Sequence, residues 1–139
     1  MDTYLLEMLL DEDLFLRIAE EAAKSPRLRK NYDLRDSEQE NSQRMLNVLL
    51  PGTKTAIHRH RDTSEVVICI YGSAIEKFYD SEGNETECIK MQAGTRVPGV
   101  VVEKDRFHSL EATDEIGVVC GFKAGKYTQL KKEDTIGDW

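Results

Sequence analysis

The stretch GTKTAIHRHRDTSEVVICIYG, residues 52–72, places two histidines and a glutamate in front of an apolar run. His58 and His60 are separated by one residue, and on a β-strand such residues project from the same face. Glu65 follows a short polar turn and begins the apolar run 66–70, which we expect to pair back against the histidine strand. Two imidazoles and one carboxylate are therefore predicted to face one point.

His108 is the one histidine outside this stretch, and we expect the fold to bring it to the same point. Three imidazoles and one carboxylate suit a single divalent metal ion, either Fe, Zn, Mn or Ni, and leave two of six octahedral positions open. Two histidines so close in sequence are also common on protein surfaces. The pattern by itself therefore leaves a surface pair open as the alternative.

The stretch also resembles the first motif of the cupin superfamily in the spacing of five residues. These are Gly52, His58, His60, Glu65 and Gly72. Gly94, Pro98 and His108 are similar to the second cupin motif, although Pro98 and His108 stand further apart than is usual. The resemblance implies a mainly β fold, a double-stranded β-helix or jelly-roll barrel, with the metal ion near its open end.

Outside the motifs, most of residues 5–128 resemble the WbuC-type cupins, which are found among bacterial surface-polysaccharide genes. The matching stretches are residues 22–32, 43–47, 51–53, 58–60 and 123–127. The chain departs from that pattern at Ile57, Arg35, Phe107 and Gly121, the last of which stands where a glutamate is expected. This resemblance implies a metal-binding barrel and implies no defined reaction.

The pattern along the chain predicts a helical start followed by one antiparallel β-domain. Apolar residues at helical spacing between positions 14 and 22 predict a helix that Asp11 caps and Ser25-Pro26 ends. Strands are predicted over residues 45–50, 66–71, 74–79, 86–91, 97–102 and 118–122. We therefore expect a helical segment over 1–41 packing on the barrel, the cupin barrel over 42–130 and a C-terminal tail over 131–139.

The formal net charge of −7 argues against nonspecific nucleic-acid binding. Residues 24–61 nevertheless hold nine Lys and Arg against four Asp and Glu. This basic segment is either a solvated face or the place where a small anionic ligand binds. Arg44 shares a strand face with Leu46 and Val48, and it would bind a phosphate or carboxylate if that face lines the barrel. The other substrate-binding candidates are Gln43, Arg27, Arg29, Asn31 and Tyr32.

These observations predict a metal-binding cupin that acts on, or binds, a small anionic sugar or carboxylate linked to surface-polysaccharide metabolism. An isomerase- or epimerase-like reaction and an Fe(II)-dependent dioxygenase use the same ligands. The alternative is a non-catalytic, metal-stabilised sugar-binding or sensor module, because the sequence offers no unambiguous general base outside the ligands and the catalytic residues stay unknown.

The start of the chain lacks the pattern of a signal peptide, and no apolar run is long enough to span a bilayer, so we expect a cytoplasmic protein without a membrane partner. We expect a homodimer, as for many cupins. Three widely spaced cysteines fit the same compartment. Cys69 and Cys120 lie within apolar runs and are predicted to be buried.

Overall fold

The computed structural model describes residues 9–126 and 128–137. The chain begins with a helix, α2 (Glu12–Ala23), whose N-cap Asp11 accepts a hydrogen bond from the Leu14 backbone N–H at 3.0 Å. Acidic side chains in the first turn suit the positive end of the helix dipole. The predicted cap and the predicted helix end are confirmed. No helix in the described part of the chain is long and apolar enough to cross a membrane.

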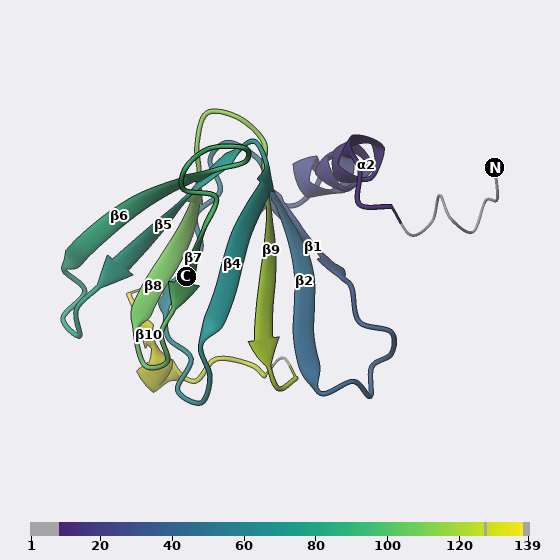
Figure 1. Ribbon diagram of the computed structural model, residues 1–139. Coiled ribbons are helices and arrows are strands. Elements are labelled where there is room, and N and C mark those ends of the chain that lie inside the picture. The colour runs from purple at the N-terminus through teal and green to yellow at the C-terminus, as the bar shows by residue number, and fades with distance from the viewer. Residues whose placement is uncertain (1–8, 127, 138–139) are drawn as a thin grey trace.

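The rest of the chain forms two antiparallel five-stranded sheets, which face each other across a shared apolar core, with α2 next to β1 and β2 (Figure 1). The first sheet has the order β1 (Arg29–Asp33), β2 (Ser42–Leu49), β9 (Gly117–Ala124), β4 (Glu65–Tyr71) and β7 (Gly99–Val102). The second has the order β10 (Thr135–Ile136), β3 (Ile57–His58), β8 (Phe107–Ala112), β5 (Ser73–Tyr79) and β6 (Glu85–Gln92). The predicted mainly β fold is confirmed.

All six predicted strands are present, but one predicted pairing is wrong. The strand that Glu65 begins, β4, pairs with β7 and β9 rather than with the histidine strand β3. The two strands belong to different sheets because the polar residues 59–64 cross from one sheet to the other. Glu65 therefore faces the histidines from the opposite sheet. Three further strands, β1, β8 and β10, were not predicted, and β3 is the expected strand that carries His58.

Two apolar clusters hold this arrangement together. One lies between the sheets and centres on Phe78, Met91 and Leu49. The other packs α2 against the first sheet and includes Phe15, Ile18, Leu46 and Val48. The helix therefore covers the face of β2 that carries Leu46 and Val48, and it leaves the opposite face of β2 to the barrel interior.

The residues after β9 run along one end of the two sheets to a 3₁₀ turn, η1 (Lys132–Asp134), and then to β10 (Figure 1). Strand β10 pairs with β3, and Thr135 lies opposite His58. Asp134 is buried beside β3 and its Oδ1 accepts hydrogen bonds from Arg59 at 3.1 Å and Arg61 at 2.5 Å. The C-terminal residues thus anchor the segment that carries His58 and His60.

Candidate metal centre

The three histidines lie together between the sheets. His58 on β3 lies directly opposite His108 on β8 in the antiparallel register, and their ring centroids are 4.3 Å apart. His60 follows β3, with its ring centroid 5.1 Å from that of His58 and 5.7 Å from that of His108. One nitrogen from each ring lies within 4.8 Å of the others. Three nitrogens at this spacing form a set that could hold a metal ion.

Hydrogen bonds fix the orientation of two of these rings. The Nδ1 atom of His58 lies 2.7 Å from the Ala56 carbonyl oxygen, to which it donates. The Nδ1 atom of His108 is bonded to the carboxyl group of Glu76, a side chain that is 1% exposed. In both rings Nε2 is left free, and the Nε2 of His108 is buried without a hydrogen-bond partner in the described chain. A buried unpaired nitrogen is costly unless something binds it.

Burial keeps all three imidazoles neutral, which is the form that binds metals. It lowers the pKa of His58 to about 4, with the charge of His108 acting in the same direction. It lowers the pKa of His60 to about 3, aided by His58. It lowers the pKa of His108 to about 4, aided by Arg106. Protons therefore do not compete for these nitrogens at neutral pH.

Two carboxyl groups complete the polar floor of the site. Burial, together with the nearby charge of Glu76, raises the pKa of Glu65 to about 7. Burial also raises the pKa of Glu76 to about 8. Glu65 lines the same cavity as the histidines and its Oε2 lies next to Gly121, where a Cβ atom would be 3.4 Å away. The absence of a side chain at Gly121 leaves open space beside this carboxyl group.

A cavity of about 240 Å³, the histidine pocket, connects this floor to the basic N-terminal region. Four of the six predicted substrate-binding residues line it: Arg27, Arg29, Asn31 and Gln43. Strand alternation explains their positions, because Arg29 and Asn31 share one face of β1 while Gln43, Met45 and Asn47 share one face of β2. Lys123, opposite Gln43 on β9, lines the pocket as well.

Tyr32 and Arg44 do not line this pocket. Tyr32 alternates with Asn31 and is 43% exposed. Arg44 shares a face with Leu46 and Val48 as predicted, but that face is turned toward α2 and solvent instead of the barrel interior. The expectation that Arg44 lies near the metal ligands is therefore corrected, because strand alternation directs the neighbouring Gln43 inward.

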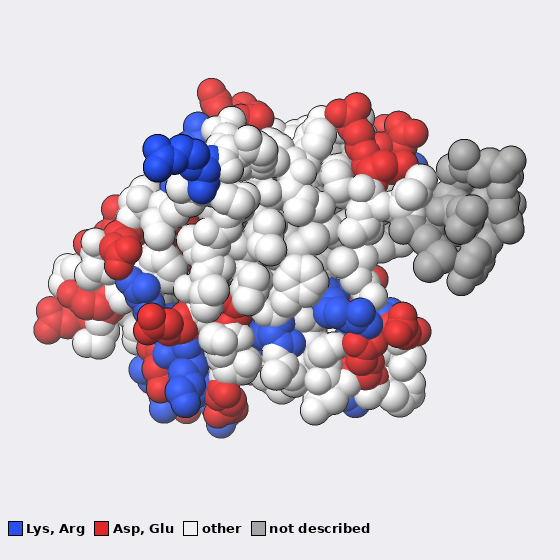
Figure 2. Space-filling view, viewed as in Figure 1, with Lys and Arg blue, Asp and Glu red and all other residues white. Residues whose placement is uncertain are grey.

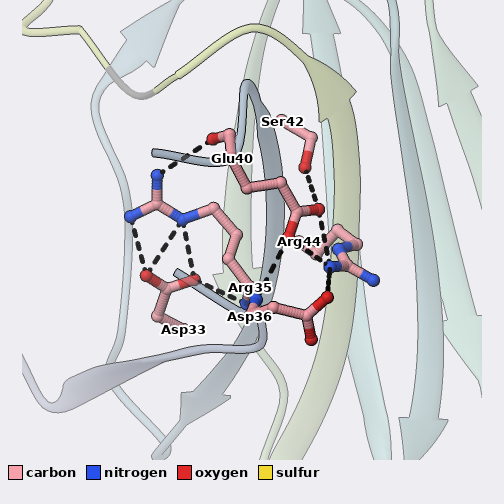
Figure 3. A network of polar contacts seen from close by, with 6 residues as sticks. All are labelled: Asp33, Arg35, Asp36, Glu40, Ser42 and Arg44. Carbon is pink, nitrogen blue, oxygen red and sulfur yellow. Dashed lines mark hydrogen bonds and ion pairs between the residues drawn. The ribbon is translucent and has the colours of Figure 1, made fainter. Parts of the chain in front are cut away.

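Arg44 instead belongs to a polar network that orders the connection between β1 and β2 (Figure 3). Its Nη2 lies 2.6 Å from Glu40 and 3.7 Å from Asp36. Glu40 also accepts from Ser42 at 2.8 Å, while Arg35 forms a two-pronged pair with Asp33. Carboxylates of this loop form ion pairs with both arginines, and neither arginine lines the histidine pocket.

Glu76 is the site residue that the sequence argument did not assign. It lies between Ala74 and Phe78 on one face of β5, and all three are buried. Two apolar neighbours at positions i−2 and i+2 were the available signal that Glu76 points inward. Glu87, on the neighbouring strand β6, is exposed and pairs with Arg106. Cys69 and Cys120 are buried as predicted, and Cys88 is exposed.

Comparison with known proteins places this geometry in context. A family model described as a domain of unknown function, DUF6016, matches residues 10–91. A search of curated protein sequences found no match. The capsular polysaccharide assembling protein CapF from Staphylococcus aureus is 18% identical with a TM-score of 0.59, and the match covers 81% of this chain and 32% of CapF. This chain therefore spans about a third of CapF.

Two further solved structures are similar. A cupin-2 domain containing protein from Shewanella frigidimarina is 23% identical with a TM-score of 0.52, over 68% of this chain and 79% of its own. A structure described in a study of the mechanism of oxalate oxidase is 15% identical with a TM-score of 0.61, over 86% of this chain and 63% of its own. These similarities show a cupin fold, as the sequence motifs predicted.

Proposed function

The chain belongs to the DUF6016 family, a domain of unknown function, and we propose from its own residues that it binds one divalent metal ion through His58, His60, Glu65 and His108. The observation that carries this proposal is the free Nε2 of His108. It is buried beside two other neutral imidazoles and has no partner in the described chain. A metal ion satisfies it, and Glu65 supplies a charge-balancing oxygen from the opposite sheet.

The donor set suits Fe, Zn, Mn or Ni, and the remaining coordination positions would face the pocket. A bound divalent ion would polarise a carbonyl or hydroxyl oxygen of a ligand, or activate a water. Glu76 holds the ring of His108 through Nδ1, as outer-shell carboxylates do in histidine metal sites. Hydrogen bonds within the protein thus orient two of the four proposed ligands, His58 and His108.

We further propose that the pocket receives a small, hydroxylated and anionic compound of the sugar or sugar-acid class. The side-chain oxygens of Gln43 and Asn47 are buried without partners among the described residues, so each can accept a hydrogen bond from a ligand hydroxyl. Arg29 and Lys123 add positive charge, and neither forms an ion pair within the described chain. The WbuC-like sequence pattern supports a link to surface-polysaccharide metabolism.

One observation favours binding without turnover as the second candidate. Among the described residues that line the pocket, the carboxyl groups are those of Glu65 and Glu76. We assign the first to the metal and find the second bonded to His108. No other acid in this lining is free to act as a general base, which a sensor or binding module does not need. A dioxygenase-like reaction in which metal-bound groups carry the chemistry uses the same site.

We also propose that two copies associate through the outer face of the first sheet. Val66 lies opposite both Val101 and Phe122, and these side chains and that of Ile68 are exposed. Figure 2 shows few charged side chains over the middle of β4 and β9, so two acidic copies can meet there with little repulsion. Analytical ultracentrifugation checks this proposal: a dimer is expected for the native chain and a monomer for Val101→Glu.

Metal analysis of protein purified without added nickel tests the central proposal. We expect about one equivalent of a divalent ion in the native chain and loss of most of it in His58→Ala, with an unchanged circular dichroism spectrum. Full metal occupancy in the folded His58→Ala variant would contradict the site. Ligand classes are then screened by thermal shift with sugar phosphates, sugar acids and nucleotide sugars, and the absence of any stabilising anion would remove the anionic-ligand proposal.

A further inference from the structure

We propose that a second cavity beside the histidine pocket, the basic cleft, is a binding site for the phosphate group of the ligand. The basic cleft lies between residues 59–63 and residues 123–126 and 128–131. It encloses about 660 Å³ and shares His60, Lys123, Thr128 and Leu130 with the histidine pocket. The inference deepens the proposed function, because it divides one ligand between a metal-facing hydroxylated part and a phosphate in the cleft.

The charges lining the cleft are opposite in sign to those of the whole protein. Five basic side chains line it against two acidic ones, in a chain whose net charge is −7. The basic residues are Arg59, Arg61, Lys123, Lys126 and Lys131, and the acidic residues are Asp62 and Asp134. A concave surface focuses this positive potential and raises the local concentration of anions. Basic side chains that lie close together repel one another. We take the retention of this repulsion in the cleft as an indication of an anionic partner.

Arg61 has a geometry suited to that partner. Its Nε donates to Asp134 at 2.5 Å, which fixes the guanidinium group in place. Neither of its terminal nitrogens has a hydrogen-bond partner in the described chain, and the side chain is half exposed at the cleft. An arginine held through Nε keeps a pre-formed pair of donors for two oxygens of a phosphate.

The lysines of the cleft are free to form ion pairs with the same phosphate group. Lys123, Lys126 and Lys131 take part in no ion pair between described residues. Asp134 is shared by Arg59 and Arg61, so its single negative charge offsets only one of these two positive charges. A tetrahedral dianion matches this surplus of donors and charge better than a single carboxylate. The class of ligand is therefore a phosphorylated sugar or a nucleotide sugar, and not an unphosphorylated sugar acid.

Isothermal titration of the metal-loaded full chain with inorganic phosphate tests the cleft. We expect saturable binding that weakens as ionic strength rises. The Lys126→Ala/Lys131→Ala variant is expected to bind phosphate at least about tenfold more weakly. Lys132→Ala is the matched control, because Lys132 lies next to the same segment but lines neither cavity. Arg61→Ala is expected to weaken binding further, and its circular dichroism spectrum reports whether Asp134 still holds the segment.

The metal proposal and the cleft proposal fail separately. The His58→Ala variant, titrated in the same way, is expected to bind phosphate within about threefold of the native chain, since His58 does not line the cleft. No saturable phosphate binding by the native chain at tens of millimolar overturns the cleft. An effect of the double lysine variant no larger than that of Lys132→Ala also overturns it. Retained phosphate binding together with full metal content in His58→Ala leaves the cleft supported and refutes the metal site alone.

Discussion

Glu76 is bonded to the Nδ1 atom of His108, and this bond leaves Nε2 as the free nitrogen of that ring. The pair is buried, so neither partner can turn to water instead. Replacing Glu76 by glutamine keeps the volume and removes the carboxyl group that orients the imidazole. We expect Glu76→Gln to weaken metal affinity by about tenfold or more, as outer-shell changes do.

A competition assay with a chromophoric chelator measures this change. Glu87→Gln is the control, because Glu87 is exposed and lies away from the histidines in an ion pair with Arg106. Equal metal affinities for the native chain and Glu76→Gln, with both chains folded, would show that His108 is oriented by packing and not by this bond.

Asp134 is predicted to stabilise the protein in a pH-dependent way. Hydrogen bonds from Arg61 and Arg59 lower its pKa below the usual value. A carboxyl group whose folded pKa is lowered stabilises the folded state above its unfolded pKa of about 4 and loses that contribution as pH falls through the folded value. Asp134→Asn should therefore lower Tm at pH 7 and at pH 5, and the difference from the native chain should close below about pH 4.

Thermal melts of both proteins across pH 3 to 7, in steps of about one unit, measure that difference. Asp114→Asn serves as the control, since Asp114 lies in an exposed turn with no ion pair in the described chain. A Tm difference that is the same at every pH would show that Asp134 acts through packing alone.

The packing of α2 against the first sheet predicts that replacing two neighbouring residues by alanine has very different effects on the free energy of unfolding. Phe15 is 5% exposed and its ring lies 5.6 Å from that of Tyr71. Leu16 is 41% exposed on the other side of the same helix. Phe15→Ala is expected to lower the free energy of unfolding by about 3–5 kcal/mol, because it leaves a cavity. Leu16→Ala should change it by less than about 0.5 kcal/mol.

Urea denaturation of the two variants measures both values. Similar losses for Phe15→Ala and Leu16→Ala would mean that the helix does not dock through the face that carries Phe15.

Two arginines on adjacent strands, Arg29 and Arg44, are expected to affect ligand binding differently when each is replaced by alanine. Arg29 lines the histidine pocket, whereas Arg44 pairs with Glu40 outside it. Arg29→Ala should reduce the thermal stabilisation by sugar phosphates several-fold. Arg44→Ala should leave that stabilisation unchanged and loosen the connection between β1 and β2. Thermal shift with each variant measures the effect, and loss of stabilisation in Arg44→Ala alone would return Arg44 to the ligand site.

The positions of His58, His60 and Glu65 and six of the strands after residue 42 could be predicted because each depends on local spacing, whereas the position of His108 depends on the fold. Two-residue periodicity placed His58 and His60 together and correctly grouped Arg44 with Leu46 and Val48. It could not tell which face of β2 the helix would cover, so it left open whether Arg44 faces the barrel interior, and it did not identify Asn47 as a pocket residue. The pairing of β4 with β7 and β9 could not be predicted from the sequence either, because the polar turn before Glu65 gives no sign that the chain changes sheets.

The pairing of β3 with β10 also determines when the proposed metal site can form during protein synthesis. The contact between Arg59 and Asp134 joins positions 75 residues apart. While the polypeptide is being synthesised, His58 and His60 leave the ribosome long before that anchor exists, and closing so long a loop is slow. We therefore expect a nascent chain to hold two exposed imidazoles without a fixed geometry, and the proposed metal site to form only after Asp134 has left the ribosome.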